Sequence, residues 1–152
     1  EIAQCLVGSE MCIRDSFTAG TERVVVNFRG VRILLEVCYD LRFPVWARNL
    51  GDYDMILYVA SWPTPRVDAW SALLRARAIE NQCYVAGVNR MGVDPACEYS
   101  GGSAIIDPYG KTIAECPWSR ESAVSADIDM EALQAFRKKF PVLDDADPFT
   151  LI

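Results

Sequence analysis

The stretch of sequence that decides the fold is VRILLEVCYDLRFP, at residues 31–44. Its first seven residues are β-branched or leucine-rich and predict a strand, and the polar, proline-bearing segment that follows predicts a turn into a helix. Cys38 stands at this junction. Unpaired N–H groups and the positive dipole end of a helix favour a thiolate and stabilise negative charge on a substrate oxygen. Cys38 is therefore a candidate nucleophile; the alternative is a small buried hydrophobic residue at a strand end.

Further apolar or β-branched runs predict strands on both sides of this junction. Arg29-Gly30 indicates a tight hairpin, and Asp107-Pro108-Tyr109-Gly110 fits a type I turn because proline is second and glycine fourth. The runs at 55–60 and 84–89 suit strands that are buried on both faces. The predicted strands cover residues 23–28, 31–37, 55–60, 84–89, 103–106, 112–116 and 123–128.

Two helices are predicted between these strands. The first begins at Thr64-Pro65, a cap followed by proline, and runs toward Gln82. The second is capped by Asp129 and ends before Pro141. Alternating strands and helices indicate the α/β class.

Composition excludes several kinds of chemistry. The 152 residues are 51% hydrophobic, and their formal net charge of −6 disfavours nucleic acid or an anionic membrane as a partner. The sequence contains no histidine, which excludes Ser–His–Asp and Cys–His catalysis and imidazole metal sites within it. Its six cysteines form no Cys-x-x-Cys pair, so we expect reduced thiols, no metal site and no cofactor. No apolar run approaches the roughly 18 residues of a membrane span.

Several motifs occur together in a characteristic order. They are VCYDLRFPVWARN at 37–49, YVASWP at 58–63, RARAIENQ at 75–82, VNRMG at 88–92, GGSAIIDPYG at 101–110 and FRKKFP at 136–141. Together they resemble the nitrilase superfamily of carbon–nitrogen hydrolases, and within it the ω-amidase-like branch. The resemblance runs from about residue 17 to residue 152. It implies an α/β fold that forms the C-terminal portion of the family's four-layer α-β-β-α sandwich.

The resemblance also implies an amidase that works through a Glu–Lys–Cys triad. Cys38 would attack the amide carbon to form a thioester, with the backbone N–H of Tyr39 as one oxyanion donor, and ammonia would leave before water hydrolyses the thioester. In the family both the glutamate and the lysine precede the cysteine. The lysines here, Lys111, Lys138 and Lys139, all follow Cys38. We therefore expect this chain to be inactive by itself.

The ω-amidase-like branch implies a short dicarboxylate monoamide, such as α-ketoglutaramate, as substrate. Arg42 is a candidate for binding the substrate carboxylate or, together with Asp40, for ordering the turn; a structural ion pair between the two is the alternative. Trp62 is a candidate pocket residue or a buried core tryptophan. We expect no nucleic-acid or membrane partner, a cytoplasmic location, and a homodimer of the full-length protein.

Residues 1–16 show neither helical nor strand periodicity and match none of the family's motifs. We expect a non-native or disordered leader there, joined to a carbon–nitrogen hydrolase domain at residues 17–152 that is truncated at its N-terminus. The alternative is a divergent N-terminal arm. Because the missing half would supply neighbouring strands, we also expect an exposed sheet edge and exposed apolar surface.

Two other functions remain open from the sequence. One is a non-catalytic binding module on the same fold, for which the missing lysine is the only support. The other is an unrelated α/β domain in which Cys38 is a redox sensor.

Overall fold

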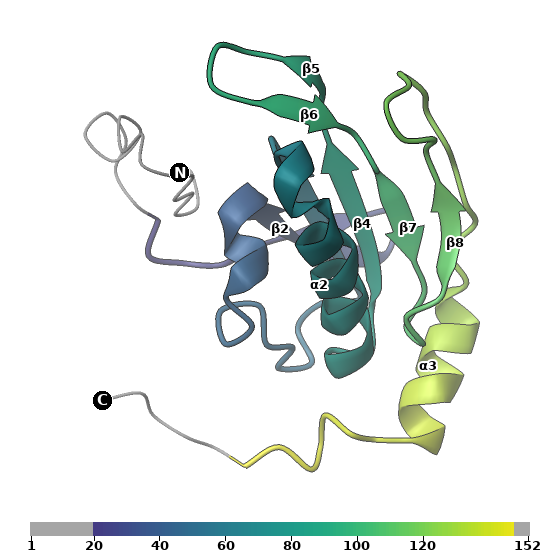
Figure 1. Ribbon diagram of the computed structural model, residues 1–152. Helices are drawn as coiled ribbons and strands as arrows, with labels where there is room; N and C mark the ends of the chain where they lie inside the picture. Colours follow the sequence, from purple (N-terminus) through teal and green to yellow (C-terminus); the bar gives the residue numbers. More distant parts are fainter. Residues whose placement is uncertain (1–19, 148–152) are drawn as a thin grey trace.

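The computed structural model describes residues 20–147, so the leader predicted at residues 1–16 lies outside the described residues. In the described part, six strands form one sheet in the order β1-β2-β3-β4-β7-β8, and β5 and β6 form a separate hairpin (Figure 1). β2, β3 and β4 are parallel to one another, and all other neighbours are antiparallel. The strands are β1 (Val24–Phe28), β2 (Val31–Val37), β3 (Met55–Ala60), β4 (Tyr84–Asn89), β5 (Met91–Val93), β6 (Glu98–Ser100), β7 (Ala104–Ile106) and β8 (Thr112–Glu115).

The long helix α2 (Val67–Glu80) lies across one face of the sheet, and α3 (Met130–Lys139) lies beyond the lower end of β8 in Figure 1. Two short 3₁₀ helices, η1 (Cys38–Arg42) and η2 (Thr64–Arg66), follow β2 and β3. The predicted helix from Thr64 is thus a 3₁₀ turn that continues as α2. α3 begins at the predicted cap, where the Asp129 carboxylate accepts a hydrogen bond from the N–H of Ala132 at 2.8 Å.

The core lies between the sheet and α2. Leu34, Ile56, Val85 and Ile106 are register neighbours on four adjacent strands, and all four are buried. On β4, Gly87 lets the helix approach closely, because a Cβ atom there would lie 2.5 Å from Leu74 of α2. This close contact joins α2 to the middle of the parallel strands.

The opposite face of the sheet is open among the described residues. Val24, Leu35, Val59 and Val88 lie on this face and are 41%, 37%, 46% and 49% exposed. A hollow of about 1880 Å³ lies along it. The prediction that residues 55–60 and 84–89 are buried on both faces is therefore wrong at Val59 and Val88, whereas Tyr84 and Ala86 of β4, on the same face, are buried as predicted. The expectation of an exposed edge and apolar surface is confirmed, because all five residues of β1 are exposed.

The local turns follow their sequence signals. Arg29 and Gly30 both have positive φ angles, 51° and 84°, as a tight hairpin between β1 and β2 requires. At the predicted type I turn the N–H of Gly110 donates to the carbonyl of Asp107 at 2.9 Å.

One predicted strand is absent from the structure, and one pair of strands was not predicted. Residues 123–128 form no strand, because no described strand lies beside them to complete a hydrogen-bonded ladder. The hairpin of β5 and β6, which extends past the end of β4 (Figure 1), has no counterpart among the predicted strands. Both errors concern pairing rather than local propensity.

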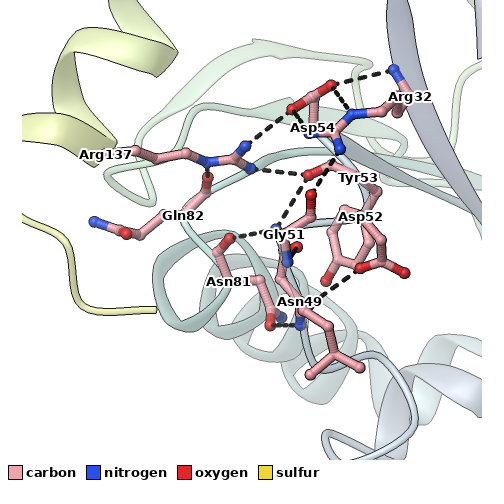
Figure 2. Close-up of polar contacts among 10 residues, drawn as sticks. Arg32, Asn49, Gly51, Asp52, Tyr53, Asp54, Asn81, Gln82 and Arg137 are labelled. Atoms are coloured by element: carbon pink, nitrogen blue, oxygen red, sulfur yellow. Dashed lines mark hydrogen bonds and ion pairs between the residues drawn. The ribbon is translucent and has the colours of Figure 1, made fainter. Parts of the chain in front are cut away.

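A charged network joins α3 to the sheet at the amino-terminal end of β3 (Figure 2). Asp54 lies between two guanidinium groups and accepts hydrogen bonds from Arg32 at 2.7 Å and from Arg137 at 2.9 Å. Arg137 also donates to the carbonyl oxygens of Tyr53 and Gln82. Because Cys38 follows the carboxyl-terminal end of the neighbouring parallel strand, this network lies at the other end of the sheet from it. Within residues 20–147, no helix is long and apolar enough to cross a membrane.

Candidate active site

Cys38 immediately follows β2, at the edge of the sheet where the parallel strands β2, β3 and β4 all end. Its backbone has a φ of 46°, in the left-handed region that residues other than glycine seldom adopt. Such conformations concentrate at functional sites, where the surrounding structure must hold them. Cys38 is 4% exposed, and its sulfur lies 3.9 Å from the carbonyl oxygen of Ser61. The turn therefore presents Cys38 toward the end of β3.

The helix predicted at this junction is η1, a 3₁₀ helix of only five residues that begins at Cys38 itself. Its shortness removes most of the dipole on which the prediction relied. The turn is held instead by Asp40, whose carboxylate accepts a hydrogen bond from the N–H of Val37 at 2.9 Å and whose carbonyl accepts one from Phe43. The N–H of Tyr39 remains a predicted oxyanion donor.

Trp62 lies beside Cys38, as predicted, and both side chains line one small cavity. Trp62 is also a core residue, because it is 3% exposed and its ring centroid lies 5.5 Å from that of Trp70. Asn89, at the end of β4, hydrogen-bonds to the backbone of Trp62. The interpretation of Trp62 as a buried core residue is thus confirmed, and its role in a substrate pocket stays a prediction. Three strand ends build this corner of the molecule.

Arg42 packs against aromatic rings rather than pairing with Asp40. Its guanidinium carbon lies 4.9 Å from the ring centroid of Trp62, which is a cation–π geometry. No described carboxylate within residues 20–147 forms an ion pair with Arg42 or with Arg66, which lines the same cavity. The alternative of an Asp40–Arg42 ion pair is therefore not observed. Two positive charges remain available beside the thiol.

The cavity itself measures only about 10 Å³. That volume accommodates about one water molecule, so these residues alone form a wall of a site and not an enclosed pocket. The cavity is lined by Cys38, Tyr39, Arg42, Ser61, Trp62, Pro63 and Arg66.

Behind the Cys38 turn lies a polar cluster that sequence reasoning missed. Glu36, Asp40 and Arg77 are all buried, with exposures of 1%, 4% and 3%. Burial, together with the nearby Asp40 carboxylate, raises the pKa of Glu36 to about 8. Burial likewise raises the pKa of Asp40 to about 6. Strand alternation was the available signal, because Glu36 lies two residues after the buried Leu34 and so on the same face.

Comparison with known proteins identifies relatives for most of the chain. The sequence profile of the carbon-nitrogen hydrolase family matches residues 6–138. This match begins inside the segment 1–16, whose interpretation as a leader stays a prediction. The omega-amidase YafV of Escherichia coli is 55% identical over 136 residues, which are 89% of this chain and 53% of that protein. The 2-oxoglutaramate amidase of Bacillus subtilis is 42% identical over 130 residues, covering 84% and 50%.

Solved structures show the same fold. A carbon–nitrogen hydrolase superfamily protein of Xanthomonas campestris, with an arsenic adduct in its active site, superposes with a TM-score of 0.84 at 46% identity. The match covers 89% of this chain and 54% of that protein. An amidase of Nesterenkonia, modified by acrylamide at its active-site cysteine, gives a TM-score of 0.70 at 25% identity and covers 93% and 55%. The chain thus spans about half the length of the relatives that it matches.

Proposed function

Because the chain belongs to the carbon–nitrogen hydrolase family, we propose that it carries the nucleophile of an amidase of the ω-amidase type. The observation that carries the proposal is the position of Cys38, in a left-handed conformation at the strand ends beside Trp62. The fold holds the thiol in the wall of a small cavity that forms only part of a substrate site. The geometry suits a nucleophile better than a packing residue, which needs no unusual backbone.

The proposed reaction proceeds through a thioester. The thiol of Cys38 gives its proton to a general base as the sulfur attacks the amide carbon, and the carbonyl electrons move to the oxygen, where the N–H of Tyr39 is one donor. The C–N bond then breaks, and the nitrogen leaves as ammonia after receiving a proton from a general acid. Water adds to the thioester carbon, the C–S bond breaks, and the acid and the thiol are released. The family resemblance assigns the general acid and base to a glutamate and the second oxyanion donor to a lysine.

Arg42, Arg66 and Trp62 support a substrate with a negative charge away from the amide. The two guanidinium groups have no described ion-pair partner, and Arg42 is held over the Trp62 ring. Arginine binds carboxylates through paired hydrogen bonds. A short dicarboxylate monoamide such as α-ketoglutaramate would place its amide at Cys38 and its carboxylate at these cations.

We propose that the remaining parts of the site, including the glutamate and the lysine, correspond to the half of the relatives that this chain does not match. The cavity at Cys38 is too small for a substrate, and no lysine precedes Cys38 in the sequence. This chain alone is therefore expected to release ammonia at a negligible rate. We further propose a homodimer of the longer protein, a cytoplasmic location, and no nucleic-acid or membrane partner.

The test uses an extended protein, in which the half that precedes the matched part in the relatives is joined to the N-terminal side of this chain. Cys38→Ala should lower ammonia release from α-ketoglutaramate by about three orders of magnitude or more, because loss of a nucleophile removes the covalent route. Cys83→Ala is the matched control, since Cys83 is fully buried and burial raises the pKa of its thiol. That variant should lose stability but keep its turnover per folded molecule.

Two outcomes would contradict the proposal. Turnover retained in Cys38→Ala would remove the nucleophile role. No amide turnover in the extended protein, with reversible oxidation of Cys38 by peroxide, would favour the redox-sensing alternative.

A further inference from the structure

Glu36 is a buried carboxyl group without a described hydrogen-bond donor. It lies on the face of β2 that packs toward α2 and is 1% exposed. Within residues 20–147, neither of its carboxyl oxygens receives a hydrogen bond or joins an ion pair. A buried carboxylate in such a place is costly, whereas a neutral carboxyl is much less so. The environment therefore favours the protonated form.

The groups that face Glu36 come from every element packed around it. They are Asp40 of η1, Arg77 of α2, Tyr58 of β3 and Arg23, which precedes β1. The terminal nitrogens of Arg77 donate to the carbonyl of Leu41 and to the carboxylate of Glu80. Its Nε has no described partner, and the charge of Arg77 opposes part of the rise in the pKa of Glu36. The phenolic oxygen of the buried Tyr58 has no described hydrogen-bond partner. The carboxyl group of Asp40 lies within hydrogen-bond reach of the Glu36 carboxyl, and this contact adds to the rise that burial causes in the pKa of Glu36 and opposes part of that rise in the pKa of Asp40.

Asp40 in turn holds the nucleophile turn. Its carboxylate accepts a hydrogen bond from the N–H of Val37, the residue before Cys38. This bond bridges the end of β2 and the 3₁₀ helix. Cys38 lies inside this bridge with its φ of 46°. A strained residue keeps its conformation only while such contacts persist.

We propose that Glu36 is a positioning residue for Cys38: its neutral carboxyl donates a hydrogen bond to the Asp40 carboxylate and keeps Asp40 oriented toward the N–H of Val37. The inference rests on the proposed function, in which Cys38 is the nucleophile. When Glu36 loses its proton, two carboxylates face each other in a buried site. The bridge then weakens, and the turn at Cys38 loosens.

The sign of the pH effect follows from the raised pKa of about 8 for Glu36, against an ordinary value of 4.5. The folded protein binds this proton more tightly than the unfolded chain does. The resulting stability is fully present below pH 4.5 and is lost as the pH rises to about 8. The shift of Asp40 has the same direction and acts over a lower range, up to about 6.

The experiment titrates ¹³C-labelled glutamate carboxyl groups by NMR in the unmodified chain. One resonance should titrate near pH 8, far above the others, and should be missing in Glu36→Gln. The control Glu115→Gln removes an exposed glutamate from a strand of the same sheet and should leave this resonance in place. A Glu36 resonance that titrates with the exposed glutamates would overturn the proposal.

Hydrogen exchange at the Val37 amide provides the second measurement. In the unmodified chain its protection should fall about tenfold between pH 6 and pH 9, as for loss of a hydrogen bond to a charged acceptor. Glu36→Gln can still donate to Asp40, so it should keep the protection at both pH values. Glu36→Leu cannot donate, so it should show low protection throughout. Protection that is independent of pH in the unmodified chain, or unchanged in Glu36→Leu, would contradict the proposed role.

These readouts require no amide turnover, so they separate this inference from the proposed function. In the extended protein, kcat should decline above about pH 8 and this decline should be absent in Glu36→Gln. If the NMR and exchange results hold but no amide is hydrolysed, the amidase proposal fails while the role of Glu36 at the turn stands.

Discussion

The side-chain amide of Asn89 holds the backbone of Trp62 at both of its polar groups. The side-chain oxygen of Asn89 accepts a hydrogen bond from the N–H of Trp62 at 2.7 Å, and the side-chain nitrogen of Asn89 donates one to the Trp62 carbonyl at 3.1 Å. The same nitrogen donates to the carbonyl of Gly101 at 2.7 Å. One buried side chain thus joins the end of β4 to the segments after β3 and β6, next to the candidate nucleophile.

Replacement of Asn89 by alanine should therefore be costly. Asn89→Ala leaves three buried backbone groups without their partner, so we expect a loss of about 3 kcal/mol in the free energy of unfolding. Denaturant titration followed by tryptophan fluorescence measures this loss. The control is Asn27→Ala, which removes a hydrogen bond to Gly30 in an exposed turn and should cost less than about 1 kcal/mol. Equal effects of the two variants would show that the Asn89 contacts add little.

Gly87→Ala should destabilise the protein through crowding. The added methyl group would lie 2.5 Å from Leu74 and 2.7 Å from Trp70, both in the core helix α2. We expect a loss of about 2 kcal/mol or more, since overpacking forces neighbouring side chains from their rotamers. Thermal unfolding measures the loss. Gly51→Ala, where nothing lies within 4 Å but φ is 79°, should cost only the backbone strain of about 1 kcal/mol.

The network at Asp54 should make the free energy of unfolding decrease at acidic pH. Burial of Asp54 opposes its ionisation, but hydrogen bonds from Arg32 and Arg137 outweigh this and lower its pKa below the ordinary 3.8. The folded state therefore releases this proton more readily than the unfolded chain. The stabilisation is present above about pH 4 and is lost as the pH falls through the lowered native value.

Arg137→Gln tests this contribution. At pH 7 it should reduce the free energy of unfolding by about 2 kcal/mol, because Asp54 keeps only Arg32 as a partner. The difference from the unmodified chain should shrink as the pH falls below 3.8, the ordinary pKa of an aspartate, and through the lowered native value. Arg90→Gln is the control, since the Arg90–Asp94 pair is exposed and should contribute less than about 1 kcal/mol at either pH. A difference that stays constant with pH would contradict the role of Asp54 ionisation.

The open apolar face should bind hydrophobic dyes and promote association. Val59→Thr combined with Val88→Thr makes this face more polar while keeping β-branched residues in the strands. We expect lower fluorescence of the dye ANS and a higher solubility limit, with little change in the unfolding midpoint. Val93→Thr makes the same substitution at a valine that is 74% exposed on the separate hairpin, and it should change neither property. Equal ANS signals in all three proteins would contradict this prediction.

Much of the candidate site could be predicted from local sequence. The strand that ends at Cys38 and the position of Trp62 beside it follow from apolar runs and from the parallel order of β2 and β3. Of the site residues that were missed, only Glu36 has a local signal, the strand alternation that places it on the buried face; Arg77 and Asn89 have none. Each acts through a partner between 4 and 36 positions away, such as the contact of Arg77 with Leu41 or of Asn89 with Trp62.

By itself the sequence determined the α/β class, the hairpin at Arg29-Gly30, the turn at Asp107–Gly110 and the cap at Asp129. These features depend on backbone preferences and side-chain bonds within a few residues, which a short window contains. Only the tertiary structure decided that residues 123–128 form no strand, that the segment after Cys38 is a short 3₁₀ helix, and that one sheet face lacks a described cover. Strand pairing and burial depend on which segment lies beside or against a strand in space. When that segment is far away in the chain, the local sequence pattern does not identify it.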